Sequence, residues 1–295
     1  MKKYCLNIAG YNIRFESVDS SSNLVLSERC FNFLSDNNSF DILIRVNSGK
    51  YCLPEKAERV FQAPFVSEIN GISVRHKDEF WSVWEYDKNL FIKTDLPLCD
   101  NESSAILHFS LTNTEWNLYI DNNSQALDPF EYPLDGLILY YLTVIKGDIL
   151  IHASGVNFDG AGYVFSGKSG KGKTTMAQLW ESCGAKILHD DRLIIRKTEN
   201  GYKMFNTPVY KNETPEESVL NKLYIISHGN INSLTHLKTA AAASLVMSNC
   251  IQHNWSVEII SKTLASALAL CESVPVMRLA FRPEKSIVKY ILENE

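Results

Sequence analysis

Apolar and polar residues alternate along much of the first 130 positions of the chain, and this pattern predicts short strands. Two clear examples lie at 4–15, broken at Gly10, and at 40–46. Alternation of this kind puts one face of a strand on a core and the other face in solvent. Similar runs between polar turns predict an antiparallel meander at 72–76, 80–86, 90–94, 106–112 and 116–120, and a short helix is predicted at 27–34.

The pattern changes after a polar segment at 121–133, which contains two prolines. A strongly apolar stretch at 134–146 predicts a helix that ends at Gly147. Strands are then predicted at 149–154, 163–165, 185–188, 193–197, 202–205, 223–227 and 274–282, and helices at 175–181, 237–252, 257–272 and 283–293. Strands that alternate with helices are typical of an α/β sheet with flanking helices. We therefore predict a β-rich α+β domain at 1–130 and an α/β domain at 131–295.

The composition excludes several classes of protein. The chain has 295 residues, enough for two ordinary domains, and its 45% hydrophobic and 21% charged residues are a globular composition. No apolar run is long enough for a membrane span and the first residues lack the apolar core of a signal peptide, so we predict a cytoplasmic protein without membrane contact. A formal net charge of −5 argues against a general nucleic-acid binder. The seven cysteines include no C-x-x-C pair, which predicts reduced thiols and no structural zinc site.

The strand predicted at 163–165 leads into the pattern G-x-x-x-x-G-K-T, the Walker A phosphate-binding motif. Gly167 and Gly172 allow φ > 0 and a close approach of the backbone to a polyphosphate, and successive N–H groups then form a nest for anionic oxygens. Lys173 is expected to reach the β- and γ-phosphates, and the hydroxyl of Thr174 to bind Mg²⁺. We therefore predict ATP and Mg²⁺ as cofactors, with nucleotide contacts from nine consecutive residues: Gly167, Lys168, Ser169, Gly170, Lys171, Gly172, Lys173, Thr174 and Thr175.

Chemistry on a bound nucleotide needs further polar groups. Asp190 and Asp191 follow the strand predicted at 185–188, whose end we expect beside the phosphates. Neighbouring carboxylates on an extended chain point in opposite directions, so one can hold Mg²⁺ through water while the other accepts a hydroxyl proton. His152 is expected on the strand next to the loop, either as a core histidine or as a metal ligand or partner of the phosphoryl group. The predicted catalytic residues are His152, Lys173, Asp190 and Asp191, and the predicted metal ligands are Thr174, Asp190 and Asp191.

Three segments together resemble one superfamily: His152-Ala-Ser-Gly, the loop at 167–175 and His189-Asp-Asp-Arg. They are similar to the HPr kinase/phosphorylase and ATP-type phosphoenolpyruvate carboxykinase superfamily, in which a histidine precedes the phosphate loop and an Asp-Asp pair follows the helix of the loop. Thr207-Pro-Val-Tyr and the tail at 274–283 also resemble the small HPr-kinase-like proteins of this group. The resemblance covers roughly residues 132–293 and implies a P-loop domain with a mixed sheet and flanking helices.

The resemblance also implies a function. Asp190 and Asp191 would serve as general base and metal site, in an order that we leave open, and His152 would be a metal ligand or an active-site residue. Some small proteins of the group are encoded with peptide natural products of the lasso-peptide type and phosphorylate a serine or a terminal hydroxyl of a precursor peptide. We therefore expect an ATP- and Mg²⁺-dependent kinase that transfers the γ-phosphoryl group to a hydroxyl of a peptide or protein. A homo-oligomer is compatible with these features.

Two alternatives stay open. One is a nucleotide-binding regulatory module that transfers nothing. The other is a small-molecule kinase or a carboxykinase-like enzyme. The domain at 131–295 is short for a carboxykinase, and no equivalent of the oxaloacetate-binding arginine and lysine set is recognisable in it. The C-terminal signature with which the kinases of the superfamily grip HPr is not recognisable either, so HPr is not the expected acceptor.

Overall fold

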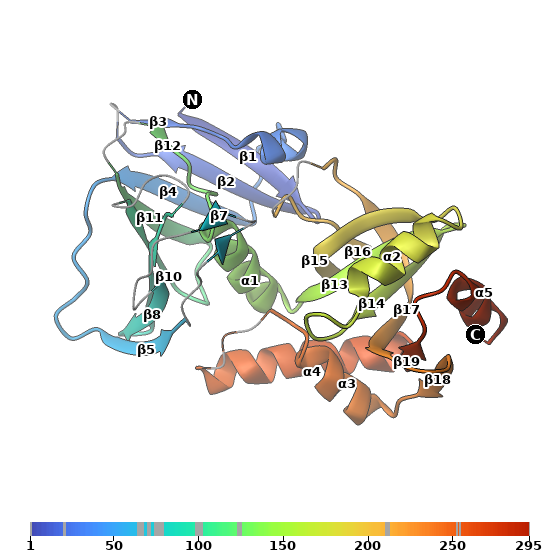
Figure 1. Ribbon diagram of the computed structural model, residues 1–295. Coiled ribbons are helices and arrows are strands. Elements are labelled where there is room, and N and C mark those ends of the chain that lie inside the picture. The colour runs from blue at the N-terminus through green and yellow to red at the C-terminus, as the bar shows by residue number, and fades with distance from the viewer. Residues whose placement is uncertain are drawn as a thin grey trace. The chain divides into compact units, whose positions relative to one another are not determined.

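The computed structural model describes residues 2–19, 22–63, 68–69, 72–73, 80–97, 103–122, 126–209, 213–251, 253 and 255–294 (Figure 1). The chain divides into two compact units, the first Met1–Tyr141 with Pro208–Thr214 and the second Leu142–Thr207 with Pro215–Glu295. Both contain sheets, and the mixed α/β class predicted from the sequence is confirmed. The boundary predicted at residue 130 stays a prediction about separable domains.

The first unit is built on an eight-stranded sheet with the order β1-β2-β4-β11-β10-β9-β8-β5. Its strands are β1 (Lys3–Ile8), β2 (Tyr11–Ser17), β4 (Ile42–Ser48), β5 (Glu58–Gln62), β8 (Trp81–Tyr86), β9 (Asn89–Asp95), β10 (Ser104–Phe109) and β11 (Glu115–Asp121). Two short pairs accompany it, β3 (Asn23–Leu24) with β12 (Ala126–Leu127) and β6 (Glu68–Ile69) with β7 (Ile72–Ser73). Alternate residues of β10 and β11 are buried, as their sequence pattern predicted.

The antiparallel meander predicted for 80–86, 90–94, 106–112 and 116–120 is confirmed, because β8, β9, β10 and β11 pair antiparallel in that order. The described part of the run at 72–76 pairs with β6 instead. β4 pairs in parallel with both β2 and β11, so the sheet is mixed. A parallel neighbour requires a long return connection, and residues 18–41 provide one between β2 and β4. That connection contains the predicted short helix, which is a 3₁₀ helix, η1 (Glu28–Phe33).

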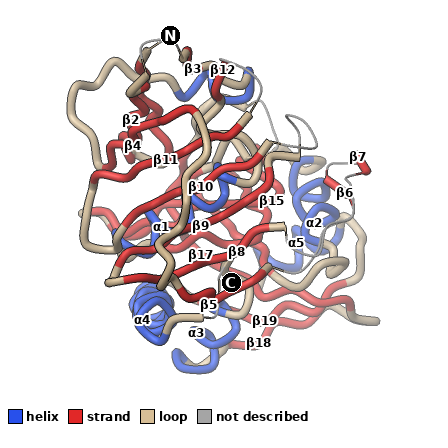
Figure 2. The backbone as a smooth tube through the Cα atoms, turned by 90° about the vertical axis from the view of Figure 1, so that its left-hand side faces the viewer, coloured by secondary structure: helices blue, strands red, loops and turns tan. Residues whose placement is uncertain are grey.

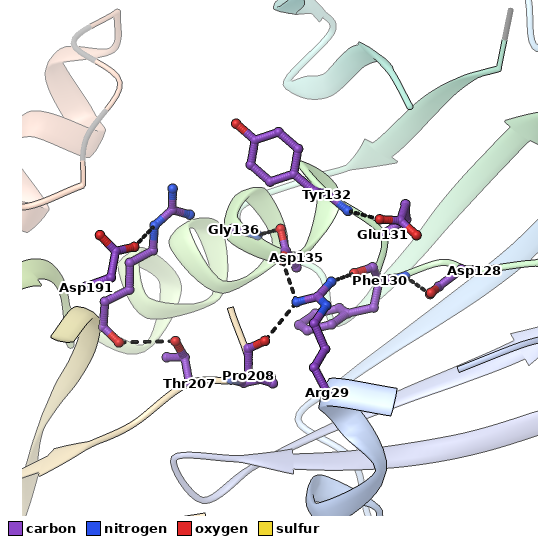
Figure 3. A network of polar contacts seen from close by, with 11 residues as sticks. Arg29, Asp128, Phe130, Glu131, Tyr132, Asp135, Gly136, Asp191, Thr207 and Pro208 are labelled. Carbon is purple, nitrogen blue, oxygen red and sulfur yellow. Dashed lines mark hydrogen bonds and ion pairs between the residues drawn. The ribbon is translucent and has the colours of Figure 1, made fainter. Parts of the chain in front are cut away.

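A partly buried arginine, whose side chain is 15% exposed, ties three segments of the first unit together (Figure 3). The guanidinium of Arg29, in η1, donates to Oδ2 of Asp135 at 2.8 Å, to the carbonyl of Phe130 at 2.7 Å and to the carbonyl of Pro208 at 2.9 Å. The side chain of Asp135 is only 1% exposed. It lies in the first turn of α1 (Leu134–Lys146), whose residues up to Tyr141 belong to this unit.

The second unit is a mixed sheet with the order β14-β13-β15-β16-β17-β19-β18, in which β14 also pairs in parallel with β17. Its strands are β13 (Ile149–Phe158), β14 (Ala161–Ser166), β15 (Lys186–Thr198), β16 (Gly201–Phe205), β17 (Glu217–His228), β18 (Ser233–His236) and β19 (Val276–Phe281). The helices that follow α1 are α2 (Lys173–Glu181), α3 (Thr239–Met247), α4 (Val257–Ser273) and α5 (Ser286–Glu293).

Helices cover both faces of this sheet (Figures 1 and 2), and each face has its own core of buried side chains. α3 and α4 pack on the face that carries Ile151, Ala153 and Leu193. α2 and α5 pack on the opposite face, against Val156 and Phe165. Because side chains alternate along a strand, neighbouring residues of β13 therefore serve different cores.

Several predicted element boundaries differ from the structure, and three of these differences lie near the predicted site residues. The predicted strand 185–188 does not end before the acidic pair, because β15 continues through Asp190 and Asp191 to Thr198 with a bulge opposite Gly155 and Val156. α2 begins at Lys173, since Gly172 supplies the first helical acceptor, to the N–H of Met176.

α3 ends at Met247, well before the predicted end at residue 252, because the backbone after it leaves the helix to pair with β13. The N–H of His152 donates to the carbonyl of Asn249 at 3.0 Å, and the N–H of Ile251 donates to the carbonyl of Leu150 at 2.9 Å. These bonds hold the first part of β13, which β14 does not reach.

Several expected features fall partly outside the described residues: 74–76 of one predicted strand, 123–125 of the predicted linker, residue 252 of a predicted helix, Tyr210 and Cys99. Cys5, Cys30, Cys52, Cys183, Cys250 and Cys271 are all free thiols. Within the part of the chain that is described, none of the helices combines the length and the apolar character needed to cross a membrane.

Candidate functional site

The Walker A segment forms a loop between β14 and α2 in the second unit. Gly170 and Gly172 have φ values of +73° and +89°, in the left-handed region that favours glycine. A Cβ atom at Gly172 would also lie 2.9 Å from Cζ of Phe281, which is too close for any side chain. The glycines therefore allow a backbone path that other residues would strain, and the path ends at the first turn of α2, whose N–H groups have no intrahelical acceptor.

Lys173 is held inside this loop. Its Nζ donates to the carbonyl of Gly167 at 2.9 Å, and the residue is only 8% exposed. Burial lowers the pKa of Lys173, and the negative charges of Asp191 and Asp190 oppose that shift. Both carboxylates thus lie within electrostatic reach of the lysine.

Strand pairing explains why these groups meet. β13 lies between β14 and β15, and its Ala153 is opposite both Ser166 and Asp191. Ser166, the last residue before the loop, donates from Oγ to the carbonyl of His152 at 3.0 Å. The start of the phosphate loop and the acidic pair are therefore joined through a single strand.

The two carboxylates have different neighbours. Ser154 is fully buried and donates from Oγ to Oδ1 of Asp190. Val156 and Phe165 belong to the core under α2, so the alternation along β13 places Ser154 and its partner Asp190 on the α2 face, which also carries Thr174.

Asp191 lies between the side chains of His152 and Arg192. Its Oδ1 is 3.3 Å from Nε2 of His152 and its Oδ2 is 3.4 Å from Nε of Arg192. Burial raises the pKa of Asp191, but the hydrogen bond from His152 and the charge of Arg192 outweigh burial, and the net pKa is lowered. Asp191 is therefore an ionised carboxylate at neutral pH, and the side chains of His152 and Asp191 are 38% and 30% exposed.

A buried histidine fixes the backbone of the acidic pair. Nδ1 of His189 accepts from the N–H groups of Asp191 and Arg192, at 3.0 and 3.1 Å. An Asp pair is unfavourable inside a strand. The bulge and these two bonds explain how β15 accommodates it.

The predicted site residues fall into two groups. His152, Lys173, Asp190 and Asp191 come together in the second unit through the contacts given above. The remaining predicted residues line the loop and the start of α2: Gly167 is buried, Gly172 and Thr175 are half-buried, and Lys168, Ser169, Gly170, Lys171 and Thr174 are exposed.

The donors suit a divalent cation that is bound together with a nucleotide. Among the described residues no three His, Cys, Asp or Glu side chains converge into a protein-only metal cage. Mg²⁺ usually takes one or two carboxylates, with water and phosphate oxygens completing its shell. The Thr174 hydroxyl and the Asp190 carboxylate, on one face of the sheet, fit that requirement.

Sequence reasoning missed three residues of this region: Ser154, Ser166 and His228. Ser154 could have been predicted from the sequence, because a residue two positions after His152 on a strand projects from the same face. His228 directly follows the strand predicted at 223–227, but its contact with the loop depends on the pairing of β17 with β14. No protein-family model matches this sequence, and a search among curated proteins finds no significant match.

Proposed function

We propose that this protein is an ATP- and Mg²⁺-dependent kinase that transfers the γ-phosphoryl group to a hydroxyl, on a P-loop domain of the HPr kinase type. The observation that carries the proposal is the position of Lys173. It lies in a glycine-bounded phosphate loop and within electrostatic reach of the paired carboxylates Asp190 and Asp191.

The loop and the start of α2 bind the phosphates in this proposal. Unpaired N–H groups at a helix N-terminus attract anions, and the Lys173 ammonium exchanges the carbonyl of Gly167 for phosphate oxygens. Mg²⁺, when bound beside Thr174 and Asp190, neutralises charge on the phosphate oxygens. The residues thus bind and orient the polyphosphate for in-line attack.

In this proposal a carboxylate of the acidic pair acts as the general base that accepts the proton of the acceptor hydroxyl. In the transfer, the acceptor oxygen forms a bond to the γ-phosphorus, the bond from that phosphorus to the bridging oxygen of ATP breaks, and ADP leaves. The hydroxyl proton passes to a carboxylate of the Asp190–Asp191 pair. His152 orients Asp191 through their 3.3 Å contact, so that the carboxylate faces the acceptor in one position.

The acceptor class rests on sequence resemblance. Some of the small HPr-kinase-like proteins that the chain resembles phosphorylate a serine or a terminal hydroxyl of a precursor peptide, and we propose a hydroxyl of a peptide or protein as the acceptor here. A regulatory module that binds nucleotide without transfer remains the alternative and is an outcome of the test.

The full-length chain should be incubated with Mg²⁺, ATP labelled in the γ-phosphate and a panel of serine-containing peptides and proteins. We expect label in an acceptor as an acid-stable phosphate ester. Asp190→Asn and Asp191→Asn should each lower kcat by about 10²- to 10⁴-fold, and Lys173→Ala should mainly raise the KM for ATP. The variant that loses a metal ligand should also require a higher Mg²⁺ concentration for half-maximal activity. This difference would show which of the two aspartates binds the metal.

The matched control is Asp159→Asn, because Asp159 is exposed in the β13–β14 turn at φ +51°, a conformation that asparagine tolerates. This variant should retain wild-type kinetics. Tight ATP binding without transfer to any acceptor would favour the regulatory module. Full activity of both Asp variants would contradict the site assignment.

A further inference from the structure

His228 lies at the end of β17, beside the phosphate loop. β17 runs parallel to β14 with Ile225 opposite Ser166, so its last residues continue along the loop after β14 has ended. A Cβ atom at Gly167 would lie 3.0 Å from the carbonyl oxygen of Ile226, which shows how closely the two segments approach. Nε2 of His228 is 3.0 Å from the carbonyl oxygen of Gly170.

This contact has a defined direction. A carbonyl oxygen only accepts, so Nε2 of His228 must carry the proton and donate it. The peptide that receives the bond lies between two glycines with left-handed φ, Gly170 and Gly172. Its N–H, from Lys171, points the other way across the planar peptide and donates to the carbonyl of Lys168 at 3.2 Å.

His228 is exposed to solvent, but its ring also contacts the loop at a second position. Its Cε1 is 3.3 Å from the position of a Cβ at Gly172, and its ring centroid is 5.9 Å from that of Phe281. The ring is therefore held by β19 on one side and by the glycine path on the other. Since glycine has the largest backbone freedom of any residue, a loop with glycines at 167, 170 and 172 needs such an external contact to keep one conformation.

We propose that His228 is a positioning residue for the phosphate loop, which it holds in its anion-binding conformation through the carbonyl of Gly170. The proposal rests on the nucleotide site proposed above, and it requires no transfer step. His228 reduces the conformational freedom that the loop must lose when phosphates bind. It acts through the loop and contacts no reacting atom.

The test compares His228→Leu, which keeps bulk without a donor, with His228→Gln, whose side-chain amide can still donate. The readout is the Kd for MgATP of the full-length chain, measured by titration calorimetry without acceptor. Loss of one net hydrogen bond corresponds to a Kd raised about three- to tenfold in His228→Leu, and His228→Gln should restore most of the affinity. His236→Leu, at an exposed histidine of β18, is the matched control and should bind as the wild type does.

Two further readouts separate positioning from general damage. The affinity for AMP, which lacks the β- and γ-phosphates, should change less than the affinity for ATP. Without nucleotide, amide hydrogen exchange across 167–174 should be faster in His228→Leu than in the wild type, and normal elsewhere.

Each outcome decides something. Equal loop exchange and equal MgATP affinity in wild type and His228→Leu would overturn the proposal, as would equal losses in the Leu and Gln variants. If the wild type binds no ATP but His228→Leu loosens the loop, the role of His228 in the loop stands and the nucleotide function fails.

Discussion

Each unit contains a polar cluster built from acidic and basic side chains, and the two clusters differ in their burial and in their neighbours. In the first unit Arg29 contacts Asp135, Phe130 and Pro208 in a buried network (Figure 3). In the second unit Asp191 contacts His152 and Arg192 beside a glycine-rich loop. The side chains of His152 and Asp191 are 38% and 30% exposed. The first cluster joins segments of chain, whereas the second leaves its side chains partly exposed to solvent.

Ionisation shows what the difference depends on. Burial, reinforced by the nearby Glu131, raises the pKa of Asp128 in the first unit to about 6. The pKa of Asp191 is lowered, because His152 and Arg192 outweigh burial. The balance between burial and oppositely charged or hydrogen-bonding neighbours therefore decides in which direction the pKa of a carboxyl shifts.

Removal of the partly buried cation should have the largest effect on stability. Arg29→Met leaves the charge of Asp135 buried without its partner, and breaking a buried pair in this way costs about 3–5 kcal/mol. Chemical denaturation followed by tryptophan fluorescence should show this loss in the free energy of unfolding. MgATP affinity should stay at the wild-type value if the network serves the first unit alone.

The control for that prediction is Arg29→Lys, which keeps the charge without the planar set of donors. Its loss should be smaller than that of Arg29→Met. Equal stability of wild type and Arg29→Met would remove the contrast between the two clusters.

The pH dependence of stability should distinguish the clusters by sign. The pKa of Asp128 in the folded protein is about 6, above its ordinary value of 3.8. The stability that this carboxyl contributes is therefore fully present below pH 3.8 and is lost as the pH rises through 6. Asp191 behaves in the opposite way, because its pKa in the folded protein is lowered. The stability that this carboxylate contributes is present above its ordinary pKa and is lost as the pH falls through the lowered pKa.

Asp128→Asn isolates the first effect, since the amide oxygen can still accept from the N–H of Phe130. The difference in unfolding free energy between wild type and variant should change by about 2 kcal/mol between about pH 4 and about pH 7, after a discount for the partial exposure of the carboxyl. The variant should be the more stable relative to wild type at the higher pH. A difference in unfolding free energy that does not change with pH would mean that burial does not raise the pKa of Asp128.

The smallest effect is expected at an exposed pair. Arg45 and Glu115 pair across neighbouring strands of the first unit with side chains 40% and 48% exposed. Arg45→Ala should lower the free energy of unfolding by less than about 1 kcal/mol, and added salt should shrink the difference further. A loss as large as that of Arg29→Met would show that burial is not the deciding variable.

Local chemistry made part of this molecule predictable. Most strands and all the helices described here were expected from periodicity. The loop was predictable because its glycines and Lys173 are neighbours in the chain. The parallel pairing of β4 was not, since strand direction depends on where a long connection returns.

The contacts inside the site could not be predicted in the same way. Asp191 and His152 are far apart in sequence, and their 3.3 Å contact exists because β13 and β15 pair in one register. His228 reaches Gly170 for a similar reason, through the pairing of β17 with β14.

The sequence by itself determined which residues are available for the proposed phosphate binding and proton transfer, and which segments form most of the strands and the helices, because these properties depend on near neighbours in the chain. Only the tertiary structure decided which carboxylate meets which cation, that β15 runs unbroken through the acidic pair, and that a histidine from another strand supports the loop. Those outcomes depend on strand register and burial, which arise when distant segments pack together.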